Sequence, residues 1–259
     1  MPLDLGLDGA VALVTGGARG VGRGIASVLA EAGARVVICG RSAPAEPASG
    51  VAFRPCDVRS PDEVAELVEW IASEYGRLDV AVNNAGGAPF AMAVDASPRL
   101  HSKIVELNLL APLIVAQAAN AVMQRQDSGG SIVMVSSVSG HRPSPGTAAY
   151  GAAKAGLDSL TATLAVEWAP KVRVNSVVAG MVLTEQSQLH YGDDEGVAAV
   201  GRTVPLGRMA RPEEIGNCVA FLASPLASYV SGSTLTAHGG GEAPGFLSAA
   251  NSEHPKEGQ

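Results

Sequence analysis

Three side chains able to handle a proton and a carbonyl oxygen stand at a spacing that favours catalysis. Tyr150 and Lys154 are four residues apart, and Ser137 lies thirteen positions before the tyrosine. Residues at i and i+4 share one helix face, with Cβ atoms roughly 5–6 Å apart. An ammonium there favours ionisation of the phenol, whose ordinary pKa is about 10, so Tyr150 is a candidate general acid/base. The pair alone is weak evidence, because Tyr-x-x-x-Lys also occurs by chance in amphipathic helices.

A glycine-rich turn near the N-terminus indicates a second kind of site. Residues 11–14 are apolar and predict a buried strand, and apolar residues recur at helical spacing from Val21 onward. Gly16, Gly20 and Gly22 lie between these segments. Glycines let the backbone turn tightly and approach a pyrophosphate, which lies at the positive end of the helix. The order of strand, turn and helix predicts a dinucleotide site, with a plain tight turn as the alternative.

Strand-like and helix-like segments alternate along the chain. We expect strands at 10–15, 35–39, 51–54, 80–83, 131–136, 172–178 and 234–236, and helices at 22–32, 61–75, 99–126, 149–169 and 212–223. Apolar strands alternating with helices indicate a parallel sheet covered on both faces. The sequence therefore predicts an α/β fold, a single-domain, Rossmann-like, doubly wound parallel sheet of about seven strands over residues 1–259. Residues from about 242 to 259, rich in Ser, Pro, Gly and charges, are expected to be loosely ordered.

Further polar residues follow predicted strands or interrupt apolar segments. Asn84 and Gly86 follow the strand at 80–83, Asn108 interrupts the apolar stretch 107–119, and Thr184 follows the strand at 172–178. Together with the glycine turn and the Ser-Tyr-Lys set, their order and spacing resemble the short-chain dehydrogenase/reductase family in its single-domain form. The resemblance covers about residues 8–241 and points to 3-oxoacyl reductase-like and related carbonyl reductases.

The resemblance implies a role for each matching residue. Tyr150 would be the acid/base, and Ser137 would hydrogen-bond the substrate oxygen. Lys154 would lower the pKa of the phenol and bind the nicotinamide ribose, and Asn108 would hold a water-linked proton path behind it. The residues expected around the cofactor are Gly16, Arg19, Gly20, Val21, Gly22, Arg41, Asp57, Val58, Asn84, Gly86, Tyr150, Lys154 and Thr184.

Two departures from the family pattern affect turns rather than the catalytic set. Ala179-Gly180 stands where Pro-Gly is usual, and His238-Gly239-Gly240 stands where Asp-Gly-Gly is frequent.

The choice of cofactor depends on the end of the second strand. A carboxylate there accepts hydrogen bonds from the NAD ribose and repels the 2′-phosphate of NADP. Gly40 occupies that position, Arg41 follows it, and Arg19 lies in the glycine turn. Two cations and no acid favour NADP(H), and NAD(H) is the alternative if both arginines are merely solvated.

Bulk properties exclude several classes of protein. The net charge of −7 argues against a nucleic-acid-binding surface. No apolar run is long enough to cross a membrane, because 107–119 is short and contains Pro112. Five dispersed histidines predict no metal site. Three scattered cysteines and the lack of a signal-peptide pattern predict a reducing, cytoplasmic location.

The sequence leaves the substrate and some local roles open. A ketone or secondary alcohol with an apolar body is expected from Pro89, Phe90, Val138, Met181, Val182 and Leu183. His141 either lines this pocket or is solvated, and the acidic segment 188–201 is either a lid, as the resemblance implies, or plain surface. The resemblance also implies a homotetramer or homodimer through helices 99–126 and 149–169.

Two other functional classes compete with an oxidoreductase. A catalytically silent NADP-binding regulatory or scaffold protein is the main alternative, although such proteins usually lose one of the catalytic residues. A sugar-nucleotide epimerase or dehydratase of the extended branch is disfavoured by the Gly16, Gly20 and Gly22 spacing and by the chain length.

Overall fold

The fold is a seven-stranded, all-parallel sheet in the order β3-β2-β1-β4-β5-β6-β7. The structure is a computed structural model and describes residues 4–44 and 50–245. The strands are β1 (Val11–Thr15), β2 (Arg35–Gly40), β3 (Val51–Pro55), β4 (Val80–Asn83), β5 (Gly130–Ser137), β6 (Val172–Ala179) and β7 (Thr234–Ala237). All seven predicted strands are confirmed, and the doubly wound α/β fold with them. Residues 246–259, most of the expected loose tail, lie outside the described residues.

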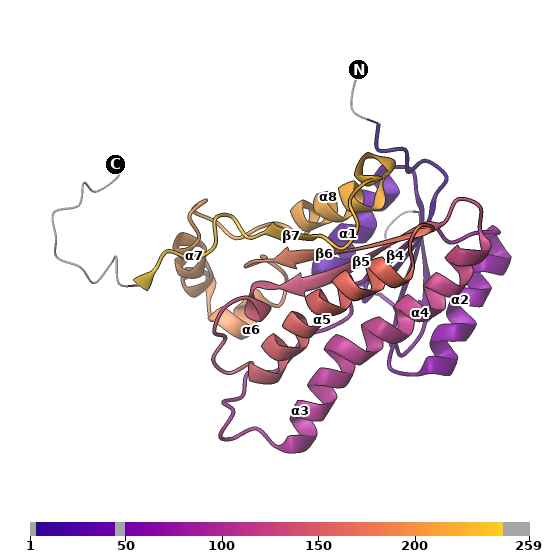
Figure 1. Cartoon of the computed structure of the whole chain (residues 1–259). Coiled ribbons are helices and arrows are strands. Elements are labelled where there is room, and N and C mark those ends of the chain that lie inside the picture. The colour runs from indigo at the N-terminus through magenta and orange to yellow at the C-terminus, as the bar shows by residue number, and fades with distance from the viewer. Residues whose placement is uncertain (1–3, 45–49, 246–259) are drawn as a thin grey trace.

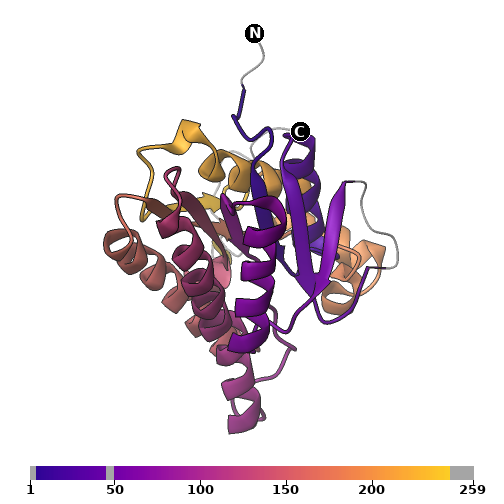
Figure 2. The ribbon, with the colours of Figure 1, turned by 90° about the vertical axis from the view of Figure 1, so that its right-hand side faces the viewer.

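Helices cover both faces of the sheet (Figures 1 and 2). One face packs on α2 (Pro61–Tyr75), α4 (Ala111–Arg125) and α5 (Ala148–Glu167), and the other on α1 (Gly20–Glu31) and α8 (Pro212–Ala223). Along β1, Val11 and Leu13 belong to the first core, whereas Ala12 and Val14 belong to the second. This two-sided burial explains why the strands are apolar throughout rather than alternating.

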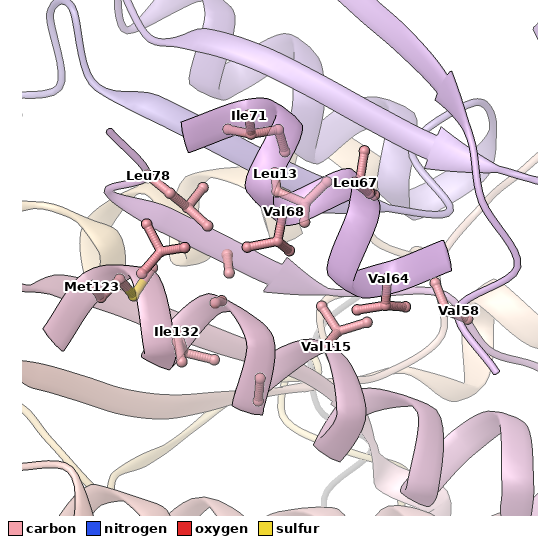
Figure 3. Close-up of a cluster of buried hydrophobic side chains, with 14 of the residues drawn as sticks. Leu13, Val58, Val64, Leu67, Val68, Ile71, Leu78, Val115, Met123 and Ile132 are labelled. Atoms are coloured by element: carbon pink, nitrogen blue, oxygen red, sulfur yellow. The ribbon is translucent and has the colours of Figure 1, made fainter. Parts of the chain in front are cut away.

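The first core is centred between the sheet and α2 and α4. Leu13 and Ile132 from the strands meet Val68 and Ile71 from α2 and Met123 from α4 (Figure 3). Ile71, Leu13, Ile132 and Met123 are fully buried, so this layer excludes water. A core of this kind holds the strand ends in fixed positions, which the site requires.

The helix predicted at 99–126 is interrupted. It consists of α3 (Pro98–Val105), a π-helical turn η1 (Glu106–Leu110) and α4. The π turn contains Asn108, the amide that interrupts the apolar stretch, and Asn108 is fully buried. Single π turns mark sites where one extra residue changes the direction of the side chains. The prediction of one regular helix was therefore wrong at this point.

The same helical unit, Pro98–Arg125, is long and apolar enough to cross a membrane by length and composition. That differs from the expectation that no such segment exists. Ala111, Val115, Ala119 and Met123 on this unit are buried in the first core. Its apolar character is thus explained by packing inside the domain.

Two short helices that were not predicted follow β6. They are α6 (Ser187–Tyr191) and α7 (Asp194–Thr203), and they occupy the segment for which the sequence left a lid and plain surface as alternatives. Asp193 caps α7 by accepting a hydrogen bond from the Gly196 amide at 3.0 Å. Figure 1 shows both helices on the side toward which the strand arrows point. The carboxyl ends of β1 and β4, where the strand order reverses, lie at this same edge, which is the usual ligand site of open α/β sheets.

Candidate active site

A cavity of about 530 Å³ opens at the carboxyl edge of the sheet. Among its lining residues are all thirteen that were expected around a cofactor, together with Ser137. Those thirteen come from the turns after β1, β2, β3, β4 and β6, from the start of helix α1 and from helix α5. Asn108 does not line the cavity and lies behind it in the π turn.

The glycine turn is shaped so that only glycine fits at its key positions. Gly16 and Gly20 have φ of 64° and 52°, in the region that side chains rarely adopt. A Cβ on Gly22 would lie 2.3 Å from the Gly16 carbonyl oxygen and 2.4 Å from Asn84 Nδ2. Asn84 Nδ2 donates to the Thr15 carbonyl at 2.9 Å and so braces this turn. The turn, the start of α1 and the volume of the cavity fit a dinucleotide whose pyrophosphate the turn would hold.

A carboxylate that was not predicted stands at this helix start. The Gly20 amide donates to Glu185 Oε1 at 3.0 Å, although the two residues are 165 positions apart in sequence. Thr184, the neighbour of Glu185, also lines the cavity. The first turn of α1 contains no acidic residue of its own, so Glu185 is the anion that meets the positive end of this helix. Its place was not foreseen because no local pattern joins residues 20 and 185.

Tyr150 and Lys154 lie on α5, as their spacing predicts. Lys154 Nζ is 5.6 Å from the centre of the Tyr150 ring. The ammonium donates to the Val135 carbonyl at 2.7 Å, and only 3% of Lys154 is exposed. Burial lowers the pKa of Lys154 to about 8, against the opposing effect of the Asp158 carboxylate. With this pKa, the Lys154 ammonium can lose its proton at mildly alkaline pH.

The pKa of Tyr150 shifts in the direction opposite to the expected one. Burial raises the pKa of the phenol, the Ser137 hydroxyl as hydrogen-bond partner lowers it, and the nearby Tyr191 raises it. Lys154 was expected to lower it, but its ammonium is directed at the Val135 carbonyl. In this arrangement Tyr150 is a protonated phenol at neutral pH and a proton donor beside Ser137.

Asn108 organises the turn after β4 rather than the cavity wall. Its Oδ1 accepts from the Gly87 amide at 2.8 Å, and its Nδ2 donates to the Gly87 carbonyl at 2.9 Å and to the Ile104 carbonyl at 2.9 Å. A Cβ on Gly86 would lie 2.6 Å from Asn108 Oδ1 and 3.5 Å from Lys154 Nζ. The buried amide therefore connects the π turn to the loop that passes the ammonium.

Cations surround the end of β2. Gly40 ends the strand, and a Cβ there would meet nothing closer than the Ser42 carbonyl at 4.0 Å. Asp57 is bound by Arg59, whose Nε lies 2.9 Å from Oδ1, and this contact lowers the pKa of the carboxyl to about 2. Arg41 adds to that lowering. Arg59, which sequence reasoning missed, lines the cavity together with Arg19 and Arg41.

The side of the cavity next to Tyr150 is more polar than the sequence suggested. Tyr191 Oη lies 3.3 Å from Met181 Sδ, and His190 and Tyr191 both line the main cavity. An adjoining cavity of about 190 Å³ is lined by Val138, Met181, His141 and the Arg142–Glu242 ion pair, among others. Of the apolar residues expected here, Phe90 is 70% exposed and Leu183 is 47% exposed.

The two departures from the family pattern meet at one place. A Cβ on Gly180 would lie 2.7 Å from His238 Cα, so the ends of β6 and β7 approach closely there. Gly180 is needed for this approach, whereas Ala179 simply continues β6. Ala179 is the β-ladder partner of Ser137, and Ala179 and Gly180 both line the main cavity.

Within residues 4–44 and 50–245, no group of three or more His, Cys, Asp or Glu side chains is arranged to hold a metal ion. The fold and the site together define a dinucleotide-binding oxidoreductase of the Rossmann type. A family model described as enoyl-(acyl carrier protein) reductase matches residues 16–242. The chain belongs to the short-chain dehydrogenase/reductase family.

Relatives and solved structures agree with this assignment. The chain is 36% identical to the 3-oxoacyl-[acyl-carrier-protein] reductase of Vibrio cholerae, over 91% of this chain and 98% of that protein. It is 35% identical to a tropinone reductase homologue of Arabidopsis thaliana, over 93% of each chain. The aldohexose dehydrogenase of Thermoplasma acidophilum superposes with a TM-score of 0.87 at 30% identity, over 96% of this chain and 98% of that one.

Proposed function

We propose that the chain is an NADP(H)-dependent enzyme that interconverts a ketone and a secondary alcohol. The observation that carries the proposal is the position of Ser137, Tyr150 and Lys154 on the same cavity as the glycine turn. Family membership supports an oxidoreductase that uses a nicotinamide cofactor. Several relatives are named as reductases or dehydrogenases, which supports the carbonyl chemistry.

Each residue has a distinct part in the proposed reaction. Bound NADP(H) would supply the hydride, with its pyrophosphate over Gly20 and its adenosine end near Arg41 and Arg59. Ser137 would donate a hydrogen bond to the substrate oxygen and hold the carbonyl in place. As negative charge develops on that oxygen, Tyr150 would transfer its proton to it. In the oxidative direction the phenolate would take the proton back, and the Lys154 ammonium would stabilise that phenolate.

NADP(H) is preferred in this proposal because of the charges near Gly40. Arg19 and Arg41 form no side-chain hydrogen bond within the described part of the chain, so both remain able to bind a 2′-phosphate. No carboxylate stands at Gly40 to bind the free ribose hydroxyls. NAD(H) remains the alternative if these arginines bind only solvent.

For the substrate, we propose a carbonyl with an apolar body, such as an acyl thioester, a steroid-like ring or a small aromatic ketone. Val138 and Met181 supply apolar surface beside the catalytic residues. The ion pair between Arg142 and Glu242 and the Tyr191 phenol add polar contacts on the same side. A substrate with a polar group attached to its apolar body would contact both the apolar surface and these polar groups.

The test is a panel of ketones and alcohols with NADPH, NADH and their oxidised forms, followed by the absorbance of the reduced nicotinamide. We expect turnover of at least one apolar ketone with NADPH. Tyr150→Phe is the control and should abolish this turnover. If NADPH bound by calorimetry while no substrate class turned over, the catalytically silent regulatory or scaffold protein would replace the proposal.

We also propose that copies of the chain pair through the helical unit 98–125 and α5, giving a homodimer or homotetramer. Leu110 is 48% exposed and Val166 is 79% exposed, and small residues such as Ala152 and Ala155 leave the α5 surface open to a second helix. Sedimentation of the full chain at micromolar concentration tests this, and a monomer would contradict it. A cytoplasmic location belongs to the same proposal and is tested by cell fractionation.

A further inference from the structure

One turn beyond Lys154 on α5, Asp158 is a carboxylate that the reaction described above does not use. Its side chain is 11% exposed. Oδ2 accepts from Ser136 Oγ at 2.9 Å, and Oδ1 accepts from Ser176 Oγ at 2.6 Å. His141 Nε2 lies 2.9 Å from Oδ2. These three partners come from β5, β6 and the turn after β5, so one side chain joins three separate elements to α5.

Ser136 connects this carboxylate to the catalytic residues. It is the neighbour of Ser137 on β5, and its hydroxyl lies 3.2 Å from the Lys154 carbonyl oxygen as well as 2.9 Å from Asp158. Because the hydroxyl has one proton, the shorter contact to the carboxylate takes it. Asp158 therefore fixes the strand residue next to Ser137 against the same helical turn that carries Lys154.

The charge of Asp158 needs a separate explanation. An asparagine carbonyl oxygen accepts hydrogen bonds from serine hydroxyls, and it avoids the desolvation cost of a nearly buried carboxylate. A buried charge is tolerated when a buried charge of opposite sign lies close to it. His141 Nε2 is the side chain in direct contact with the carboxylate, at 2.9 Å, but half of that imidazole is in solvent. Lys154, one helical turn before Asp158, is the buried cation, and the carboxylate acts on its pKa in the direction that keeps it protonated.

We propose that Asp158 is a positioning residue for this active site. Its carboxylate holds Ser137 and Lys154 in register through Ser136, and it supplies the counter-charge that keeps the buried Lys154 side chain an ammonium. His141 closes the outer side of the carboxylate, with 47% of its own side chain exposed to solvent. The loop histidine thus belongs to this cluster, while it also lines the adjoining cavity.

Few charged groups face this pair from the surrounding elements. On its own helix, Lys154 is influenced by the charge of Asp158 and lies 5.6 Å from the centre of the Tyr150 ring, and Tyr191 of α6 raises the pKa of Tyr150. Asp158 meets His141 from the turn after β5, while β6 contributes only the Ser176 hydroxyl. From the π turn, the uncharged Asn108 reaches the loop beside the ammonium. Asp158 is accordingly the group whose removal should alter the charge of Lys154 most.

The test measures the titration of Lys154 directly, apart from turnover. The chain has four lysines, so ¹³C-labelled lysine gives four ε-carbon signals, and Lys154→Met assigns the one of interest. Asp158→Asn and Asp158→Ser each remove the charge while keeping a polar side chain. In either variant that folds, we expect the pKa of Lys154 to fall by about one unit or more. The alkaline fall of kcat/KM should move to lower pH by the same amount.

Matched variants separate the charge from simple packing. Ser176→Ala removes one hydrogen bond to the carboxylate and keeps the charge, so the Lys154 titration should stay where it is. Asp158→Glu keeps the charge and displaces it, so we expect a titration close to the unmodified one with a reduced kcat. A purely structural Asp158 would lower the melting temperature in Asp158→Asn and leave the Lys154 titration unchanged, which would overturn the proposal.

If neither neutral variant folds, Asp158→Glu decides the question. An unaltered kcat in Asp158→Glu would overturn the proposal, because the displaced carboxylate no longer fixes Ser136. The inference rests on the proposed function only for its kinetic readout. If the chain bound NADPH but reduced nothing, the lysine titration would still support or overturn the part assigned to Asp158.

Discussion

Exchange of the charges at the end of β2 should reverse the choice of cofactor. The change is Gly40→Asp combined with Arg41→Ser. A Cβ at Gly40 meets nothing within 4.0 Å except the Ser42 carbonyl at that limit, and its φ is not in the left-handed region, so Asp is accommodated without strain. The new carboxylate would accept the ribose hydroxyls of NADH and repel the 2′-phosphate of NADPH.

The size of the reversal follows from the surroundings of Arg41. A charge-assisted hydrogen bond contributes about 1.5–3 kcal/mol, and because Arg41 is exposed we take the lower end, or roughly tenfold. A new carboxylate on the ribose hydroxyls contributes about as much for NADH, and its repulsion of the 2′-phosphate costs NADPH about 1 kcal/mol. The free-energy difference between NADPH and NADH binding should change by about 4 kcal/mol, so the ratio of the two dissociation constants should change roughly 1000-fold.

Calorimetric titration of NADPH and NADH against both proteins measures this ratio. The unmodified protein should bind NADPH about tenfold or more tightly than NADH, and the double variant should prefer NADH. Arg35→Ser is the matched control, because it removes the same charge from the opposite end of β2, away from the cavity. Equal binding of the two cofactors by the unmodified protein would refute the reasoning, since Arg19 and Arg41 would then be solvated surface groups.

Three further predictions concern single residues. Tyr150→Phe should keep the affinity for NADPH and lower kcat by about 10²–10⁴-fold, because only the transferable proton is lost; retention of more than about a tenth of the turnover would argue for another acid. Lys154→Ala should weaken cofactor binding and turnover together. In the unmodified protein, kcat/KM should fall as the pH rises through about 8, because the Lys154 ammonium loses its proton there. A kcat/KM that stayed constant to well above pH 8 would contradict the lowered pKa of Lys154. Glu185→Gln should tighten NADPH binding severalfold, because the carboxylate competes for the Gly20 amide and repels the pyrophosphate. Glu195→Gln on α7 is the control. An unchanged affinity would mean that the Glu185 side chain moves away from the start of α1 at no cost in free energy.

The sequence predicted the parts of this molecule that are encoded locally. The apolar runs gave the strands, since both faces of β1 are buried, and the glycines of the turn were identifiable because no other residue fits there. The order of the motifs was specific enough to indicate the family. Phe90 was predicted to line the substrate pocket because it is apolar. The residue type does not show which way a side chain points, and most of the Phe90 side chain is exposed to solvent.

The parts that the sequence did not predict depend on contacts between distant segments. Glu185 meets Gly20, Arg142 meets Glu242, and Asp158 meets Ser176, with separations of 165, 100 and 18 residues. The direction of the Tyr150 pKa shift was also missed, because burial raises this pKa more than the Ser137 hydrogen bond lowers it, and burial is a property of the folded chain. The π turn could not be predicted because its residues are those of an ordinary α-helix.

Because of that π turn, the number of residues in the helical unit around Asn108 matters as much as which residues they are. An α-helix advances by about 100° per residue, so the one extra residue in the turn rotates everything after it relative to α3. Asn108 is thereby directed at Gly87 while the face of α4 that carries Val115, Ala119 and Met123 still meets the sheet. Removal of a single residue between positions 106 and 110 would make the helix regular, and either the amide or the apolar face would then lose its partner. Substitutions along this helix are therefore expected to be tolerated more readily than any insertion or deletion before Ala111.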